Sequence, residues 1–140
     1  MLRKMQTADL ERVLAIWLAA NTEAHSFIAA DYWQSNLAAV RQTLPQAEVY
    51  VYQQDSKILG FIGLQDDYIA GIFVESRARG QGIGKQLLDY VKTGHKRLTL
   101  QVYQENTRAV RFYQREHFQI DSTGVDENTG ACELKMLWQS

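Results

Sequence analysis

The chain has 140 residues, of which 46% are hydrophobic and 22% charged, and its formal net charge is −1; this is an ordinary globular composition, so we predict a single domain over residues 1–140. The near-neutral charge argues against nucleic acid or an anionic membrane surface as a partner, and no apolar run approaches the ~20 residues of a membrane span. The one cysteine, Cys132, excludes an internal disulfide and a cysteine-rich zinc site, so we expect a cytoplasmic protein without a bound metal.

The first third of the chain is predicted to form a short strand and two helices. Residues 2–5 have the apolar edge of a strand, and Thr7 offers a hydroxyl group that could cap the first helix. The apolar side chains of this helix recur at helical spacing: Leu10, Val13, Leu14, Trp17 and Leu18. The polar segment 21–27 predicts a loop. Asp31 is then expected to cap a second helix, which Pro45 ends.

From residue 48 onwards the apolar residues follow the pattern of strands. Segment 48–53 alternates between apolar and polar residues, and segment 58–64 is apolar enough to be covered on both faces. Segment 68–74 is a third apolar run, and turns are expected at 55–56 and 66–67. Glycines inside these strands suggest bulges or the close approach of another backbone.

The second half of the chain alternates helices and strands. A helix beginning at Ile83 is followed by a strand at 98–102 and a helix at 107–116, and segments 118–120 and 131–137 are predicted as a final pair of strands. The complete order is β-α-α-β-β-β-α-β-α-β-β. It predicts an α/β protein in which one mixed sheet carries helices on both faces.

The fourth predicted strand runs into a basic, glycine-rich loop that leads into a helix. The free N–H groups of the first helical turn, together with nearby cations, favour a phosphate, and glycines let the backbone approach it. A P-loop would need Ser or Thr after Lys85, and a dinucleotide fingerprint starting at Gly80 would need glycine in place of Lys85. The spacing present is Arg-x-x-Gly-x-Gly at Arg79, Gly82 and Gly84. By itself, this spacing is equally compatible with a glycine turn that caps an ordinary helix.

This spacing resembles the pyrophosphate-binding motif of the GCN5-related N-acetyltransferase (GNAT) family, whose members bind acetyl-CoA. Downstream, Asn106, Ala109, Phe112 and Tyr113 have the spacing Asn-x-x-Ala-x-x-Phe-Tyr, which is similar to the other half of the family signature. His117 stands where the family usually has glycine in a left-handed turn, a conformation that histidine tolerates better than most residues. The resemblance covers essentially the whole chain. It implies the GNAT fold, acetyl-CoA as co-substrate and acetyl transfer to a primary amine.

If strands 68–74 and 98–102 lie side by side and diverge at their C-terminal ends, a slot opens between them. Backbone groups of Ile72 and Val74 without a partner strand could then pair with the pantetheine arm of the cofactor, as an added strand does. The resemblance places the pyrophosphate on the loop 79–84 and the thioester deep in the slot. The cofactor-binding residues that we expect are Ile72, Phe73, Val74, Arg79, Gly80, Gln81, Gly82, Ile83, Gly84, Lys85, Asn106, Ala109 and Phe112.

Tyr113 matches the position of the family's usual general acid, which protonates the leaving thiolate. Without the motif, the same residue would be read as an aromatic side chain packed beside Phe112. A backbone N–H near Phe73 or Val74 is expected to stabilise the oxyanion. Asn106 could bind the pantetheine, cap its helix, or do both. The candidate general base is Glu75, which follows the catalytic strand, and the other candidates are Glu48, Asp66 and His25.

The apolar stripe of the second helix is formed by Trp33, Leu37, Val40 and Leu44. His25, Phe27 and Tyr32 lie outside this stripe and are predicted to line the acceptor site, although a loop packed on the sheet would explain them equally well. The expected acceptor is a lysine or N-terminal amine of a protein or peptide, or a small amine metabolite, and the expected assembly is a monomer or homodimer. The alternative function is a non-catalytic acetyl-CoA sensor. Retention of Tyr113 disfavours it, because binding alone does not require that hydroxyl. A phosphate-binding regulator without acyl chemistry is disfavoured by the second motif.

Overall fold

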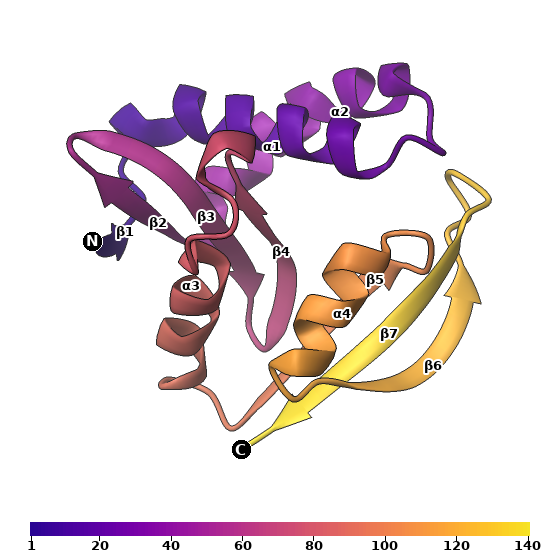
Figure 1. The fold of residues 1–140 in the computed structure, drawn as a ribbon. Helices are drawn as coiled ribbons and strands as arrows, with labels where there is room; N and C mark the ends of the chain where they lie inside the picture. The colour runs from indigo at the N-terminus through magenta and orange to yellow at the C-terminus, as the bar shows by residue number, and fades with distance from the viewer.

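The computed structural model describes residues 1–140 and contains one seven-stranded mixed sheet (Figure 1). Its helices and strands are β1 (Leu2–Lys4), α1 (Leu10–Ala24), α2 (Ala30–Thr43), β2 (Glu48–Gln54), β3 (Lys57–Gln65), β4 (Tyr68–Val74), α3 (Ile83–Lys92), β5 (Arg97–Tyr103), α4 (Thr107–Arg115), β6 (Gln119–Val125) and β7 (Cys132–Gln139). Short 3₁₀ turns precede α1, follow α2 and precede α3: η1 (Thr7–Asp9), η2 (Leu44–Gln46) and η3 (Ser76–Ala78). The strand order is β1-β2-β3-β4-β5-β7-β6. The predicted order of elements and the mixed sheet are confirmed.

The N-terminal helices differ from the prediction at their ends. Gln6 and Asp9 form a reciprocal capping box around η1, so Thr7 is not the cap. α1 continues to Ala24 because the buried side chain of Asn21 donates a hydrogen bond to the carbonyl of Trp17, 2.9 Å away, and so fits inside the helix. α2 begins at Ala30 without a side-chain cap, so the predicted cap at Asp31 is also wrong.

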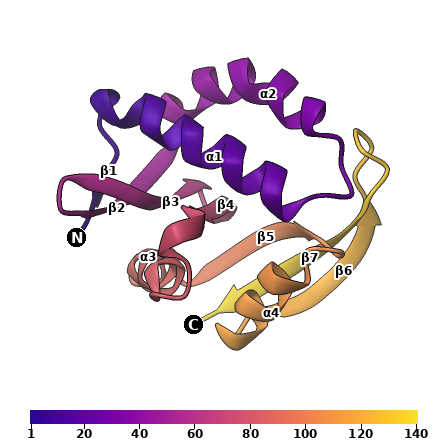
Figure 2. The same cartoon turned by 45° about the horizontal axis from the view of Figure 1, so that its top comes forward.

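Helices cover both faces of the sheet, as Figures 1 and 2 show. α1 packs over β2–β4, where its side chains bury an apolar cluster that includes Val13, Leu14, Val49, Val51 and Phe61. α3 and α4 lie on the other face and share a larger cluster that includes Leu87, Leu88, Leu100, Tyr113 and Met136. Removal of these side chains from water is the main force that holds the helices on the sheet. None of the helices combines the length and the apolar character needed to cross a membrane.

β4 contains a bulge in its first half. Gly63 of β3 is opposite Gly71, and Leu64 is opposite Ile69, so Ala70 has no partner on β3. A bulge twists the strand and reverses the order in which its side chains face the two sides of the sheet. The bulge that the glycines of this region suggested is therefore present.

β4 and β5 separate immediately after this bulge. They are parallel neighbours at only two positions, Tyr68 opposite Thr99 and Ile69 opposite Leu100. Towards their C-terminal ends the two strands diverge, as Figure 1 shows. We call the divergent part of the two strands the splay.

Gly71 is required next to the bulge for a steric reason. A Cβ atom at this position would lie 2.4 Å from the ring of Phe73, which packs across the glycine backbone and against Phe61 with ring centroids 5.1 Å apart. No real Cβ contact is that short, so a side chain at Gly71 would have to displace the Phe73 ring. The conformation of β4 at the splay therefore depends on this glycine.

Candidate active site

The edge of β4 that faces the splay carries backbone groups without a partner strand. The N–H of Glu75 donates to the carbonyl of Leu59, 2.8 Å away, which makes these residues a hydrogen-bonded pair between β3 and β4. Bonded pairs alternate in an antiparallel ladder, so Phe73 also bonds to β3, whereas the N–H and C=O groups of Ile72 and Val74 point away from β3 towards β5. The splay therefore presents two donors and two acceptors to an extended, amide-containing ligand.

The glycine-rich loop follows β4 through the short turn η3. Gly80 and Gly82 have positive φ angles, 81° and 78°, and a Cβ atom at either position would enter open space. α3 begins at Ile83 with Gly82 as its N-cap and with no side-chain cap, so no side chain satisfies the N–H groups of the first turn. This loop has the free donors and the open backbone of an anion site.

Gly84 has a different environment from Gly80 and Gly82. It lies within the first turn of α3, and a Cβ atom there would be 3.6 Å from the ring of Phe112 and 3.8 Å from the side chain of Ile72. The glycine therefore lies beside residues of β4 and α4, where the loop meets the splay.

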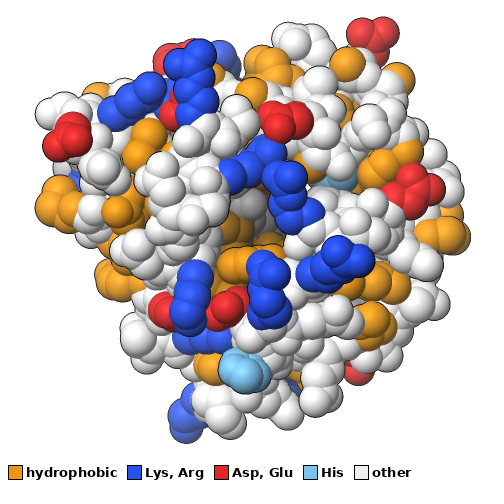
Figure 3. Space-filling model, viewed as in Figure 1, with side chains coloured by type: hydrophobic (Ala, Val, Ile, Leu, Met, Phe, Trp, Pro, Cys, Tyr) orange, Lys and Arg blue, Asp and Glu red, His pale blue; other side chains and the backbone are white.

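Cations surround the loop, and two of them are paired. Arg79 forms an ion pair with Glu23 of α1 at 2.7 Å, and Lys85 contacts Asp89 at 3.0 Å and Glu116 at 3.1 Å. Figure 3 shows lysine and arginine side chains around a hollow in the middle of the face that carries α3 and α4. Other exposed cations of the loop and of α4 are Arg77, Arg108, Arg111 and Arg115. The exposed Gln81 completes the loop.

Tyr113 lies on α4 and is 7% exposed, with its ring between those of Phe112 and Phe118 at centroid distances of 5.2 and 5.5 Å. Burial, and to a smaller extent the nearby Tyr68, raises the pKa of Tyr113 well above its usual value. The hydroxyl therefore keeps its proton throughout the neutral pH range. It can act as a proton donor even though the ring is packed in the core.

Asn106 caps α4 and connects it to the end of α1. Its Oδ1 accepts a hydrogen bond from the N–H of Ala109 at 3.3 Å, and its Nδ2 lies 3.2 Å from Nε2 of His25. Because an amide NH₂ can only donate, the geometry assigns the acceptor role to Nε2 and the proton to Nδ1 of His25. Asn106 thus fixes both the start of the helix and the tautomer of the histidine.

His25 is buried in an aromatic cluster at the C-terminal end of β5. Its ring centroid lies 5.7 Å from Phe27, 5.1 Å from Trp33 and 5.0 Å from Tyr103. Burial lowers the pKa of His25, so the imidazole is neutral at pH 7. Phe27 and Tyr32 are only half-buried. The three residues predicted for the acceptor site thus lie close together, with His25 enclosed and the other two reaching the surface.

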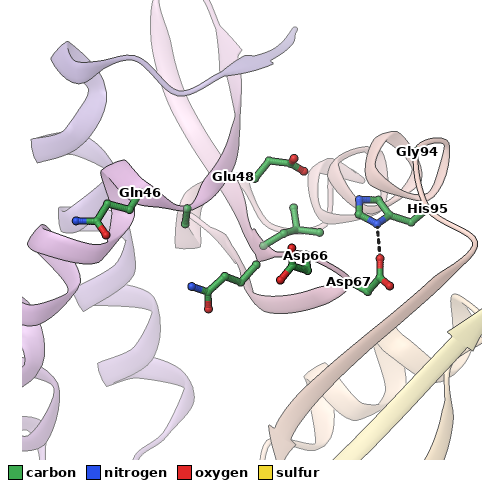
Figure 4. Close-up of a pocket in the computed structure, with 9 residues that line it drawn as sticks. Gln46, Glu48, Asp66, Asp67, Gly94 and His95 are labelled. Carbon is green, nitrogen blue, oxygen red and sulfur yellow. Dashed lines mark hydrogen bonds and ion pairs between the residues drawn. The ribbon is translucent and has the colours of Figure 1, made fainter.

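Of the carboxylates predicted as candidate general bases, Glu75 is paired with cations, and Glu48 and Asp66 lie away from the splay. Glu75 is held by Arg12 at 2.9 Å and by Lys57 at 3.8 Å, so its negative charge is already compensated. Glu48 and Asp66 line a shallow polar depression between the start of β2, the end of β3 and α3, together with the pair formed by His95 and Asp67 (Figure 4). This depression adjoins the N-terminal end of β4, whereas the splay opens towards its C-terminal end.

Tyr103 belongs to the same aromatic cluster and was not among the residues predicted from the sequence. Its ring contacts Phe27 and Trp33 as well as His25, and its hydroxyl donates to Asp126 at 2.5 Å. Alternation along β5 indicates that Tyr103 points away from the core, but only the folded structure brings it to the loop between α1 and α2. The structure contains no group of His, Cys, Asp or Glu side chains arranged to hold a metal ion.

Comparison with known sequences gives one family and several relatives. The family described as acetyltransferase (GNAT) domain matches residues 45–120. The chain is 36% identical over 140 residues to peptidyl-lysine N-acetyltransferase YiaC of Escherichia coli K12, with 99% of this chain and 96% of the relative covered. It is 29% identical over 130 residues to peptidyl-lysine N-acetyltransferase YjaB of Salmonella typhimurium, with 92% and 90% covered.

Solved structures show the same architecture. The solution structure of the apo form of YjaB from Escherichia coli superposes with a TM-score of 0.86 at 26% identity and covers 98% of this chain and 95% of that one. The PaiA N-acetyltransferase of Thermoplasma acidophilum, crystallised with coenzyme A, superposes with a TM-score of 0.82 at 17% identity and covers 100% and 98%. At that lower identity, the second likeness concerns the fold alone.

Proposed function

Because the chain belongs to the GNAT family of acetyltransferases, and is thus an N-acetyltransferase that uses acetyl-CoA, we propose that its acceptor is the side-chain amine of a lysine in a protein or peptide. The observation that carries this proposal is the whole-length similarity to two relatives named for peptidyl-lysine acetylation. The splay adds support, because an acceptor on a long aliphatic side chain could reach it from the surface.

In our proposal the glycine loop binds the pyrophosphate of the cofactor. The support is the pair of left-handed glycines, Gly80 and Gly82, and the uncapped first turn of α3. The pantetheine arm lies along the splay and pairs with the free backbone groups of Ile72 and Val74, in the manner of an added strand. Asn106 stands at the open end of the splay, where its side chain already caps α4.

The reaction that we propose is direct attack of the neutral amine on the thioester carbonyl. The N–H of Val74 faces the splay, whereas that of Phe73 faces β3, so Val74 is the better donor for the oxyanion. When the tetrahedral intermediate collapses, the C–S bond breaks and the thiolate takes a proton from the Tyr113 hydroxyl. The new amide nitrogen loses its remaining extra proton, which leaves an acetamide and free CoA.

The aromatic cluster at the end of β5 is our proposed wall for the acceptor. Phe27 and Tyr32 are half-buried, and each contacts a buried ring of the same cluster: Phe27 contacts His25, and Tyr32 contacts Trp33 with centroids 4.9 Å apart. Half-exposed rings can pack against the methylene groups of a lysine and attract its ammonium group. The buried rings of His25 and Trp33 pack behind those two rings.

The exposed, unpaired Cys132 supports a reducing, cytoplasmic location.

An acceptor screen that measures release of free CoA tests this function. We expect turnover with lysine-containing peptides and little turnover with free amino acids or polyamines. The same peptides with N-acetylated α-amines and with arginine in place of lysine are the matched controls. Exclusive turnover with a small amine would show that the acceptor class is wrong. Binding of acetyl-CoA without turnover on any amine would favour the sensor function instead.

A further inference from the structure

The face of β5 and β7 that points away from α4 carries one half-buried carboxylate, that of Glu133. Glu133 is directly opposite Tyr103, and hydrogen bonding between the neighbouring residues Gln104 and Cys132 shows that this is a non-hydrogen-bonded pair, in which side chains lie close together. Leu134, the next residue, is buried in the core shared with α4, so Glu133 points to the opposite face. This is the face on which Tyr103 meets the aromatic cluster.

The same face extends to the base of the splay. Tyr68, at the first of the two residue pairs between β4 and β5, donates a hydrogen bond from its hydroxyl to Oε1 of Gln101 at 3.3 Å. Gln101 precedes Tyr103 by two residues on β5 and therefore shares its face. A continuous polar and aromatic surface thus runs from the point where β4 and β5 part to Glu133. Tyr113 reaches the same region from the α4 side, since it shares a buried cluster with Ile69, the residue after Tyr68.

No cation neutralises the carboxylate of Glu133. None of the ion pairs in the structure involves Glu133. Asp126 is its anionic neighbour, and that carboxylate already accepts hydrogen bonds from the hydroxyl of Tyr103 and the N–H of Asn128. A partly desolvated carboxylate without a partner is unfavourable by itself and favours the arrival of a cation.

The surroundings of Glu133 also suit proton transfer. Burial, and secondarily Asp126, raises the pKa of the Glu133 carboxyl above its usual value. The titratable and charged groups that face it are Tyr68 of β4, Tyr32 of α2, Tyr103 of β5, Asp126 of the turn between β6 and β7, and the exposed Lys135 two residues along β7. A carboxylate with a raised pKa is a stronger base than an ordinary glutamate.

We propose that Glu133 binds the ammonium group of the acceptor and removes one proton from it before the acetyl transfer. This inference rests on the proposed function and assigns the general base to a residue that was not among the candidates from the sequence. In balanced form, the ammonium gives one proton to the Glu133 carboxylate. The resulting free amine forms the C–N bond of the tetrahedral intermediate, and the C–S bond breaks when that intermediate collapses. The thiolate takes its proton from Tyr113. The second proton of the nitrogen returns to Tyr113 through solvent, and Glu133 releases its own proton to water.

The pH dependence of kcat/KM for the acceptor, in the wild type and in Glu133→Gln, tests this role. At neutral pH we expect the variant to lose about 10²–10⁴-fold in kcat/KM for the acceptor, the range of general base catalysis, with KM for acetyl-CoA unchanged. Its rate should then rise about tenfold per pH unit towards the lysine pKa of ~10.4, because only amine already free in solution can react. Glu133→Asp should retain part of the activity. Glu127→Gln, an exposed change in the adjacent turn, should match the wild type.

The outcomes separate this inference from the proposed function. The acceptor in this experiment is whichever amine the wild type acetylates. If that amine is not a lysine peptide, the proposed acceptor class is wrong, but the wild type and Glu133→Gln can still be compared on it. A Glu133→Gln profile of the same shape and height as that of the wild type would exclude the role. An equal loss at every pH, or an equal rise in KM for both substrates, would show that Glu133 only supports the fold.

Discussion

Replacement of Gly82 by leucine tests the glycine loop through two separate quantities, the stability of the free protein and its stabilisation by acetyl-CoA. Gly82 has a φ of 78°, and a Cβ there meets no other atom within 4 Å, so the only intrinsic cost is the left-handed backbone. That cost is about 1–2 kcal/mol. With an unfolding entropy of about 2.1 cal/mol/K per residue, the 140 residues give about 0.3 kcal/mol/K. The expected fall in Tm of the free protein is therefore about 3–7 °C.

Acetyl-CoA is expected to raise the Tm by an amount similar to the fall caused by the leucine. Acetyl-CoA at 100 times its Kd stabilises the wild type by about 2.7 kcal/mol, which corresponds to a rise in Tm of about 9 °C. A leucine side chain at Gly82 would occupy the space that the pyrophosphate needs, so we expect most of this rise to disappear. Differential scanning fluorimetry with and without acetyl-CoA measures both quantities in one experiment.

Gly130 provides the matched control. It has a φ of 76° and open space around its Cβ position, but it lies in the turn before β7. Gly130→Leu should therefore lower the Tm of the free protein as much as Gly82→Leu does and keep the full rise with acetyl-CoA. If both variants keep the full rise, the loop does not bind the pyrophosphate. If both lose it, the effect reflects general destabilisation.

Three further changes test the remaining parts of the site. Tyr113→Phe keeps the ring in the core and removes one hydroxyl, so it should bind acetyl-CoA normally but lower kcat by about 10²-fold or more, and an unchanged kcat with chemistry rate-limiting would exclude Tyr113 as the acid. Phe27→Ala and Tyr32→Ala should raise KM for the acceptor in steady-state kinetics and leave KM for acetyl-CoA alone; equal increases in both constants, with a lower Tm, would mean that these residues only support the fold. Gly71→Ala should cost about 1–3 kcal/mol in urea unfolding, because the ring of Phe73 must move away from a Cβ at 2.4 Å, and unchanged stability would show that the ring moves freely.

The strands and the second-half helices could be predicted because their local signals agree with their environment. His117 has a φ of 74°, the left-handed conformation expected where the family usually has glycine. Asp55 and Ser56 both adopt positive φ in the tight turn between β2 and β3. The wrong predictions concern the ends of helices, where a contact made only in the folded protein replaces the one expected from neighbouring residues. The Asp9 carboxylate, which also forms an ion pair with Arg3 at 2.7 Å, caps the turn η1 in place of the Thr7 hydroxyl.

The site was predictable only where its residues form a contiguous motif. Gly80 and Gly82 could be recognised because a left-handed turn before a helix leaves a sequence signature. The partners of Glu75 could not be predicted, since Arg12 is 63 positions away along the chain. Glu133 likewise becomes a candidate only when the register between β5 and β7 is known, because a shift of one residue would turn its side chain into the core.

The splay also has a consequence for the cooperativity of the fold. Strand pairing between the β1–β4 half and the β5–β7 half of the sheet consists of only two residue pairs. At the open end of the splay, the side chains of His25 and Asn106 form a separate contact. Amide protons at this seam are therefore expected to exchange through a local opening well below the free energy of global unfolding. A pantetheine chain bound along β4 would act as an eighth, non-peptide strand. The cofactor would then be part of the architecture during each catalytic cycle, and its departure would loosen the joint between the two halves.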